Sequence, residues 1–159
     1  TGALTYGGQV AESRLRRFTY HKVWSATEPT ECETMNGNLV LLPMDIARVV
    51  GNLDPVYEHA AGDIDYALRA RKAGYRVFVA PGFVGNCSNN PRAGTFLDPT
   101  LPFAVRWKKM MSRKGLPPRS WLQLTRKHGG PVWLIYFIWP YFKLIIDGVC
   151  NRPTLSRKE

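Results

Sequence analysis

The segment from Gly51 to Tyr75, which continues into a predicted strand over Arg76–Ala80, constrains the fold of this chain more than any other part. Asp63 stands where an N-cap or first-turn acid belongs, and apolar residues follow it at helical spacing. Gly74 is well suited to end such a helix, and the residues after it alternate like a strand. The sequence therefore predicts a helix and a strand joined by a glycine, with two carboxylates, Asp63 and Asp65, where the helix begins.

Periodicity and turn residues outline the rest of the chain. A run of Leu and Val over residues 39–42, set between Asn-Gly and a proline, predicts a buried strand. The polar segments 26–33 and 85–94 are typical of loops, and residues 13–25 fit a helix or a strand equally. Helices are predicted over Met44–Val50, Pro102–Lys114 and Arg119–Lys127.

This order of elements predicts an α/β fold with a helical C-terminal tail. We expect an α/β domain over residues 1–98, a basic and aromatic helical extension over 99–150, and a polar tail over 151–159. At 159 residues the chain is one domain or part of one.

The formal charge of +10 is unevenly distributed. Between Pro99 and Ile146 there are nine Lys and Arg residues and no Asp or Glu. Such an asymmetry favours an anionic partner, and the alternative is a solvated basic surface. The three cysteines, Cys32, Cys87 and Cys150, are widely spaced and form no CxxC pair, so they predict reduced thiols and no zinc site.

Two interpretations of the carboxylate pair differ in what the pair does. In the structural interpretation Asp63 only caps the helix, and Asp65 pairs with Arg69 four residues later. In the catalytic interpretation a carboxylate at the start of a helix, beside Gly62, acts on a bound ligand. The surrounding pattern, which continues through Gly74 and the following strand, favours the second.

Four motifs in the first half together resemble the second half of a family 2 glycosyltransferase domain. The resemblance runs from about residue 6 to about residue 88, and the combined spacing is far more specific than a single Asp-x-Asp. The motifs are Asn36-Gly-Asn-Leu-Val-Leu-Leu-Pro43, Gly51-x-Leu-Asp54, Gly62-Asp-Ile-Asp-Tyr-Ala-Leu-Arg69, and Gly74-Tyr75 with a strand ending in Pro81.

The resemblance implies a partial GT-A fold, a nucleotide-binding α/β sandwich with a mostly parallel sheet. It also implies transfer of a sugar, with inversion, from a nucleotide-diphosphate donor to a saccharide or lipid-linked acceptor. Asp63 matches the Asp of the family's acidic pair, so it is expected to be the general base, with Asp65 supporting it. Substrate-binding residues are expected at Asn36, Gly37, Asn38, Asp54, His59, Gly62 and Arg69.

This chain departs from the family pattern at two places. Gly62 stands where the family usually has Glu, and Asn86-Cys87-Ser88 stands where many relatives have a His that completes the metal site. A divalent cation, Mg²⁺ or Mn²⁺, is expected for the complete enzyme, with its ligands mostly outside this chain. The donor-binding strands of the family would also precede Thr1.

We therefore expect this chain alone to show no sugar transfer and little or no nucleotide binding. Titration calorimetry of the 159-residue chain with nucleotide-diphosphate sugars would measure this. Binding in the micromolar range would contradict the expectation.

The segment Pro131–Ile146 is apolar or aromatic except for two prolines and Lys143. Its sixteen residues fall short of the roughly 20 needed to span a bilayer. The segment is rich in Trp and Tyr and follows basic helices, which favours a position on an anionic membrane surface. The alternatives are that it packs on the domain core, forms a homo-oligomer interface or spans the membrane. We expect a cytoplasmic location on the inner face of the cell membrane.

Two other functions compete with the enzyme. Basic residues interleaved with Trp107 and Trp121 fit a nucleic-acid-binding module, but no known binding motif is present and we expect no nucleic-acid partner. A non-catalytic, membrane-associated assembly protein with a glycosyltransferase-like fold is the other alternative, which Gly62 keeps open.

Overall fold

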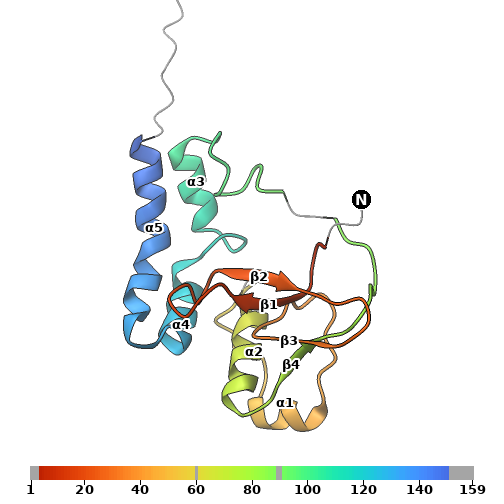
Figure 1. Ribbon diagram of the computed structural model, residues 1–159. Coiled ribbons are helices and arrows are strands. Elements are labelled where there is room, and N and C mark those ends of the chain that lie inside the picture. The colour runs from red at the N-terminus through yellow and green to blue at the C-terminus, as the bar shows by residue number, and fades with distance from the viewer. Residues whose placement is uncertain (1–3, 60, 89–90, 151–159) are drawn as a thin grey trace, which may run out of the picture. The chain divides into compact units, whose positions relative to one another are not determined.

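The computed structural model describes residues 4–59, 61–88 and 91–150, so the polar tail predicted over 151–159 lies outside the described residues. The chain divides into two compact units, Thr1–Asn90 and Pro91–Glu159. Among the described residues, unit 1 contains short strands and two helices, and the regular elements of unit 2 are helices (Figure 1).

The described strands of unit 1 form two antiparallel pairs. Strand β1 (Gly8–Ala11) pairs with β2 (Tyr20–Val23), and β3 (Thr30–Cys32) pairs with β4 (Val77–Val79). A single bridge between Gln9 and Thr34 connects the two pairs. The class is mixed α/β, but these pairs are not the mostly parallel sheet that the resemblance implies.

The predictions for two segments of unit 1 were wrong. The stretch 26–33 was expected to be a loop, yet β3 lies within it, because Cys32 is buried opposite Val77 while Glu31 is exposed. The run 39–42 was expected to be a buried strand, but it is irregular and exposed, and Leu41 keeps 96% of its surface accessible. An apolar run is buried only where another surface covers it, and none of the described residues does so here.

Helix α2 (Gly62–Lys72) confirms the predicted helix before Gly74. It begins after Ala61, whose φ of 71° is left-handed, so Asp63 is a first-turn acid and not the N-cap. At the other end Gly74 has a φ of 91°, and the N–H of Tyr75 donates to the carbonyl of Ala70 at 3.1 Å, the six-residue closure of a Schellman motif. The positive φ explains why glycine ends this helix.

The core of unit 1 is small and centred on α2. The side chains of Tyr66, Ala67 and Ala70 are buried there, as is Cys32 on β3. Helix α1 (Met44–Val50) was predicted with the same bounds, and it buries none of its residues. Polar contacts, described below, also link the end of α1 to α2.

Unit 2 consists of α3 (Phe103–Met110), α4 (Pro118–His128), a short 3₁₀ turn (Gly130–Val132) and α5 (Trp133–Cys150). Both predicted helices are confirmed, although α3 ends four residues before the predicted Lys114 and α4 extends one residue further than predicted at each end. Met110, Leu124 and Leu144, one from each long helix, are almost fully buried.

Helix α5 continues through Pro140, although proline has no N–H to donate to the carbonyl four residues earlier, that of Tyr136. The indole N–H of Trp121 on α4 points at this place and lies 3.1 Å from the Tyr136 carbonyl and 3.2 Å from the Phe137 carbonyl. A side chain of the neighbouring helix thus supplies the donor that proline removes.

Candidate functional site

The Asp63 carboxylate lies at the start of α2, where two backbone N–H groups hold it. Its Oδ2 accepts a hydrogen bond from the N–H of Gly37 at 2.9 Å, and its Oδ1 accepts one from the N–H of Ile64 at 2.8 Å. The Gly37 bond joins two motifs that are 26 residues apart in the sequence. The first-turn position also places the negative charge near the positive end of the helix dipole.

This arrangement leaves Asp63 able to accept a further hydrogen bond. A carboxylate has about four acceptor positions, and the two backbone bonds use only part of them. The residue is half-buried, so its carboxylate is held in place and still reachable from solvent. A fixed, accessible carboxylate can accept a proton from a hydroxyl group that binds beside it.

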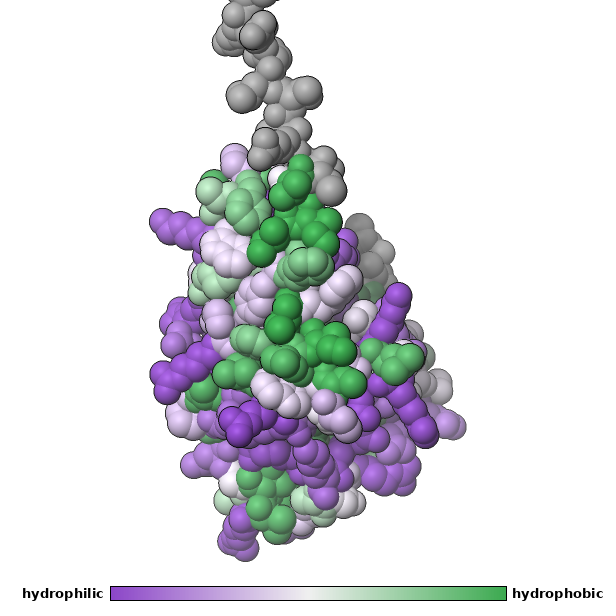
Figure 2. Space-filling model, turned by 90° about the vertical axis from the view of Figure 1, so that its left-hand side faces the viewer, coloured by the Kyte–Doolittle hydropathy of each residue, from purple (hydrophilic) through white to green (hydrophobic). Residues whose placement is uncertain are grey.

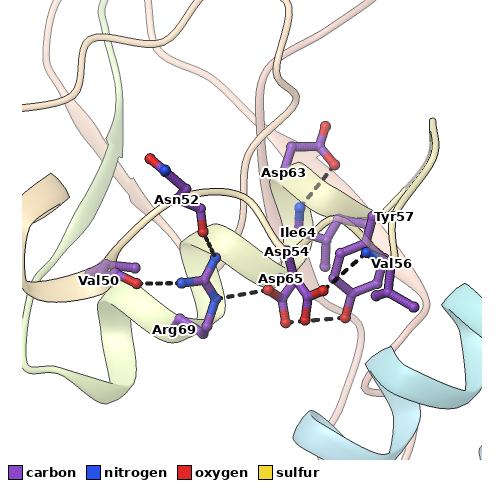
Figure 3. A network of polar contacts seen from close by, with 9 residues as sticks. All are labelled: Val50, Asn52, Asp54, Val56, Tyr57, Asp63, Ile64, Asp65 and Arg69. Carbon is purple, nitrogen blue, oxygen red and sulfur yellow. Dashed lines mark hydrogen bonds and ion pairs between the residues drawn. The ribbon is translucent and has the colours of Figure 1, made fainter.

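Asp65 has a different environment, shown in Figure 3. It has no exposed surface, and its Oδ2 accepts a hydrogen bond from Arg69 Nε at 2.8 Å. Its Oδ1 accepts one from the hydroxyl of Tyr57 at 3.2 Å. Burial, and then the charge of Asp65, raise the pKa of Tyr57 well above its usual value, which keeps this hydroxyl a donor.

The Arg69 guanidinium connects α2 to the end of α1. Besides the Asp65 bond it donates to the backbone carbonyls of Val50 and Asn52, the latter at 2.9 Å (Figure 3). It also lies 4.9 Å from the ring centre of Tyr66. This polar network therefore links the end of α1, which has no fully buried residue, to α2.

The structure brings the predicted site residues together in two groups and leaves two apart. Asn36 and Gly37 lie beside Asp63, while Arg69 and Asp54 lie in the Asp65 network, where Asp54 accepts the N–H of Val56 at 3.0 Å (Figure 3). Gly62 is the first residue of α2. The side chains of Asn38 and His59 are exposed.

Sequence reasoning missed Gln9 on β1. Its side-chain Nε2 donates to Asn36 Oδ1 at 3.0 Å, next to the residue that holds Asp63. Among the described residues, Gln9 Oε1 and the fully buried hydroxyl of Thr34 have no hydrogen-bond partner. Buried polar atoms of this kind commonly hold water or a ligand group. No local pattern marks Gln9, because its role depends on β1 reaching the Asn36 loop.

An open hollow of about 360 Å³ lies between α1 and α2. Its lining is mostly apolar and consists of Leu42, Ala47, Gly51, Asn52, Leu53 and Tyr66. Because Asp63 is not among these residues, the hollow is separate from the candidate base.

A metal site does not form among the described residues, where no three His, Cys, Asp or Glu side chains come close enough to share an ion. Asp63 and Asp65 have the letters of an Asp-x-Asp motif, but their oxygens serve different partners. The residues present therefore do not fit Mg²⁺ or Mn²⁺, and the cation expected for a complete enzyme stays a prediction.

The Asp65–Arg69 pair should be required for the stability of unit 1. We expect Arg69→Met to lower the free energy of unfolding by about 3–5 kcal/mol, because it leaves a buried carboxylate without its cation. The double variant Asp65→Asn with Arg69→Met should lose less than the sum of the two single losses. Urea denaturation followed by circular dichroism measures all four proteins.

The matched control for that cycle is Arg71→Met, also on α2. Its partner Glu33 is 4.0 Å away and both side chains are more than one-third exposed, so the loss should stay within about 0.5 kcal/mol. Equal losses for Arg69→Met and Arg71→Met would show that the buried pair has no special weight.

Gln9 should hold the loop that binds Asp63. In Gln9→Met we expect amide hydrogen exchange at Gly37 to accelerate by about two- to tenfold, since one hydrogen bond contributes about 0.5–1.5 kcal/mol. Nuclear magnetic resonance measures this rate directly. Lys22→Met, at the position facing Gln9 in the β1–β2 register, should leave the rate unchanged, and an equal acceleration there would contradict a specific role for Gln9.

Searches against known protein families, curated proteins and solved structures each found no match to this chain. The function must therefore be argued from the residues and their geometry.

Proposed function

We propose that unit 1 is the acceptor-side half of an inverting glycosyltransferase, in which Asp63 is the general base. The observation that carries the proposal is the hydrogen bond from the Gly37 N–H to Asp63 Oδ2. It joins, in space, two of the motifs on which the family resemblance rests. The carboxylate so held remains accessible, as a base that meets a substrate must be.

The reaction we propose is a single displacement at the anomeric carbon of a nucleotide-diphosphate sugar. The acceptor hydroxyl donates its proton to Asp63 while its oxygen forms a bond to that carbon. The bond from the carbon to the diphosphate oxygen breaks on the opposite side, and its electron pair leaves with the nucleotide diphosphate. The configuration at carbon is inverted, and the proton finishes on the carboxylate.

Asp63 is a better candidate for the base than Asp65. Asp65 is fully buried, and its two oxygens accept hydrogen bonds from Arg69 and Tyr57. Removing Asp65 from these partners to meet a substrate would leave buried charges unpaired, which is costly. We therefore give Asp65 the role of fixing the helix that presents Asp63.

The donor sugar nucleotide, its acceptor and a divalent cation belong to this proposal as partners of the complete enzyme. The described residues form no metal site, so no step above depends on a cation. The acceptor is proposed to be a saccharide or a lipid-linked saccharide, since the base acts on a hydroxyl group.

Asp63→Asn tests the proposal most directly. The amide oxygen can still accept the Gly37 N–H, but the side chain can no longer accept a proton, so we expect kcat to fall by about 10²–10⁴-fold. The measurement is sugar transfer by the protein as its gene encodes it, with a panel of nucleotide-diphosphate sugars and saccharide or lipid-linked acceptors.

Asp45→Asn is the matched control, because Asp45 is also a first-turn aspartate of a helix in unit 1 but is exposed on α1. It should keep the full rate. Undiminished transfer by Asp63→Asn would exclude Asp63 as the base. Absence of transfer by the unaltered protein with every donor would favour the non-catalytic assembly protein.

A further inference from the structure

Helix α5 has two unlike sides. One side faces α3 and α4 and contains the buried Leu144 with half-buried aromatic residues. The other side is exposed and apolar, and Figure 2 shows these side chains running along the surface. We name this exposed side the α5 apolar face; it consists of Leu134, Ile135, Ile138, Trp139, Phe142, Ile145, Ile146 and Val149, which are 41–63% exposed.

Specific contacts fix which side of α5 is free. Trp121 on α4 donates to the α5 backbone near Pro140, and the hydroxyl of Tyr141 donates to the carbonyl of Leu116 at 2.9 Å. Nearer the end of α5, the guanidinium of Arg106 on α3 lies 3.7 Å from the carboxylate of Asp147. The helix is thus held against α4 along one part and α3 along another, so it cannot rotate its apolar face inward.

An exposed apolar face of this length needs a partner. The charges of unit 2 indicate which kind. Residues 91–150 contain ten Lys and Arg and only two Asp and Glu. Both acids are engaged within the unit, since Asp98 accepts hydrogen bonds from Thr100 and Gly94 and Asp147 faces Arg106. The exposed basic residues on and beside the helices are Lys108, Arg113, Lys114, Arg119, Arg126 and Lys143.

This excess positive charge argues for lipid and against a second copy of the chain. Two copies joined through the α5 apolar face would bring two strongly basic units together, which like-charge repulsion opposes. Anionic lipid headgroups complement the same charge, and the acyl chains beneath them cover apolar side chains. Trp139 on the face also belongs to the residue types that prefer the boundary between headgroups and acyl chains.

The packing of unit 2 decides how α5 meets the lipid. Gly130–Val149 is long and apolar enough to cross a bilayer, by length and composition alone. However, α4 and α3 pack against this segment and carry exposed Arg119, Arg126 and Lys108. A crossing helix would take these charges into the hydrocarbon, at a cost of about 2.5–3.5 kcal/mol each.

We propose that α5 lies in the plane of an anionic membrane surface, with its apolar face at the boundary between headgroups and acyl chains and the basic residues of unit 2 against the headgroups. Lys143, which is also exposed on α5 and follows Phe142 of the face, reaches the headgroups with its ammonium group while its methylene chain lies nearer the acyl boundary. The proposal does not depend on the proposed transfer reaction.

Vesicle co-sedimentation with the full chain tests the proposal. We expect the chain to bind vesicles of phosphatidylcholine with phosphatidylglycerol at least about tenfold more tightly than phosphatidylcholine alone, and to bind less tightly as salt is raised. Ile135→Gln with Phe142→Gln, which polarises two exposed positions of the face, should weaken binding at least about tenfold. Circular dichroism verifies that this variant keeps its helices.

The matched control is Leu41→Gln with Val49→Gln in unit 1, where both side chains are at least as exposed. It should bind like the unaltered chain, as should Asp63→Asn, which separates this test from that of the transfer reaction. Equal binding to both vesicle types, or unchanged binding by the α5 variant, would overturn the proposal. Bound protein that resists extraction at alkaline pH would also overturn it, because such resistance indicates a membrane-spanning helix. A dimer that forms without lipid and that the α5 variant dissociates would overturn it as well.

Discussion

The buried ion pair of Asp65 and Arg69 is the interaction on which unit 1 depends. Helix α1 contributes no fully buried side chain, and its apolar Ile46, Ala47 and Val50 are half-buried. The Arg69 guanidinium adds a polar link, because it binds backbone carbonyls at and just after the end of α1 and the carboxylate of Asp65 on α2. A buried pair is not strongly stabilising by itself, but removing one partner is costly because it leaves the other charge buried and unpaired.

Asp63 belongs to the same first turn of α2 as Asp65. Two residues before the ion pair, its carboxylate meets the Gly37 N–H, and Gln9 holds the neighbouring Asn36. Two carboxylates in the first turn of α2 thus have separate tasks. The oxygens of Asp65 accept hydrogen bonds from groups inside the protein, whereas Asp63 can still accept a hydrogen bond from the solvent side. This difference makes a proton-accepting role physically reasonable for Asp63.

In unit 2 the hydrogen-bonding requirement of a backbone carbonyl determines how α5 packs. Pro140 leaves a carbonyl of α5 without its usual donor, and the Trp121 indole from α4 lies where it can replace it. The contact also selects the side of α5 that faces its neighbours. The apolar residues on the opposite side then remain exposed, so the same feature that lets α5 stay helical also creates the surface for which we infer a lipid partner.

The sequence by itself determined the local elements. The helix before Gly74, the bounds of α1 and the helices after Pro102 and Pro117 follow from side-chain periodicity, proline and glycine, because these act within one or two turns of the chain. The pairing of Asp65 with Arg69 at a spacing of four could be predicted in the same way.

Only the tertiary structure decided which surfaces are covered and which distant groups meet. The run 39–42 had the pattern of a buried strand but is exposed, and β3 lies in a segment whose acids suggested a loop. The Gly37–Asp63 bond and the contact of Gln9 with Asn36 join residues 26 and 27 positions apart. Burial and such contacts depend on which groups lie opposite each other in the folded protein. The neighbouring residues in the sequence do not determine which groups these are.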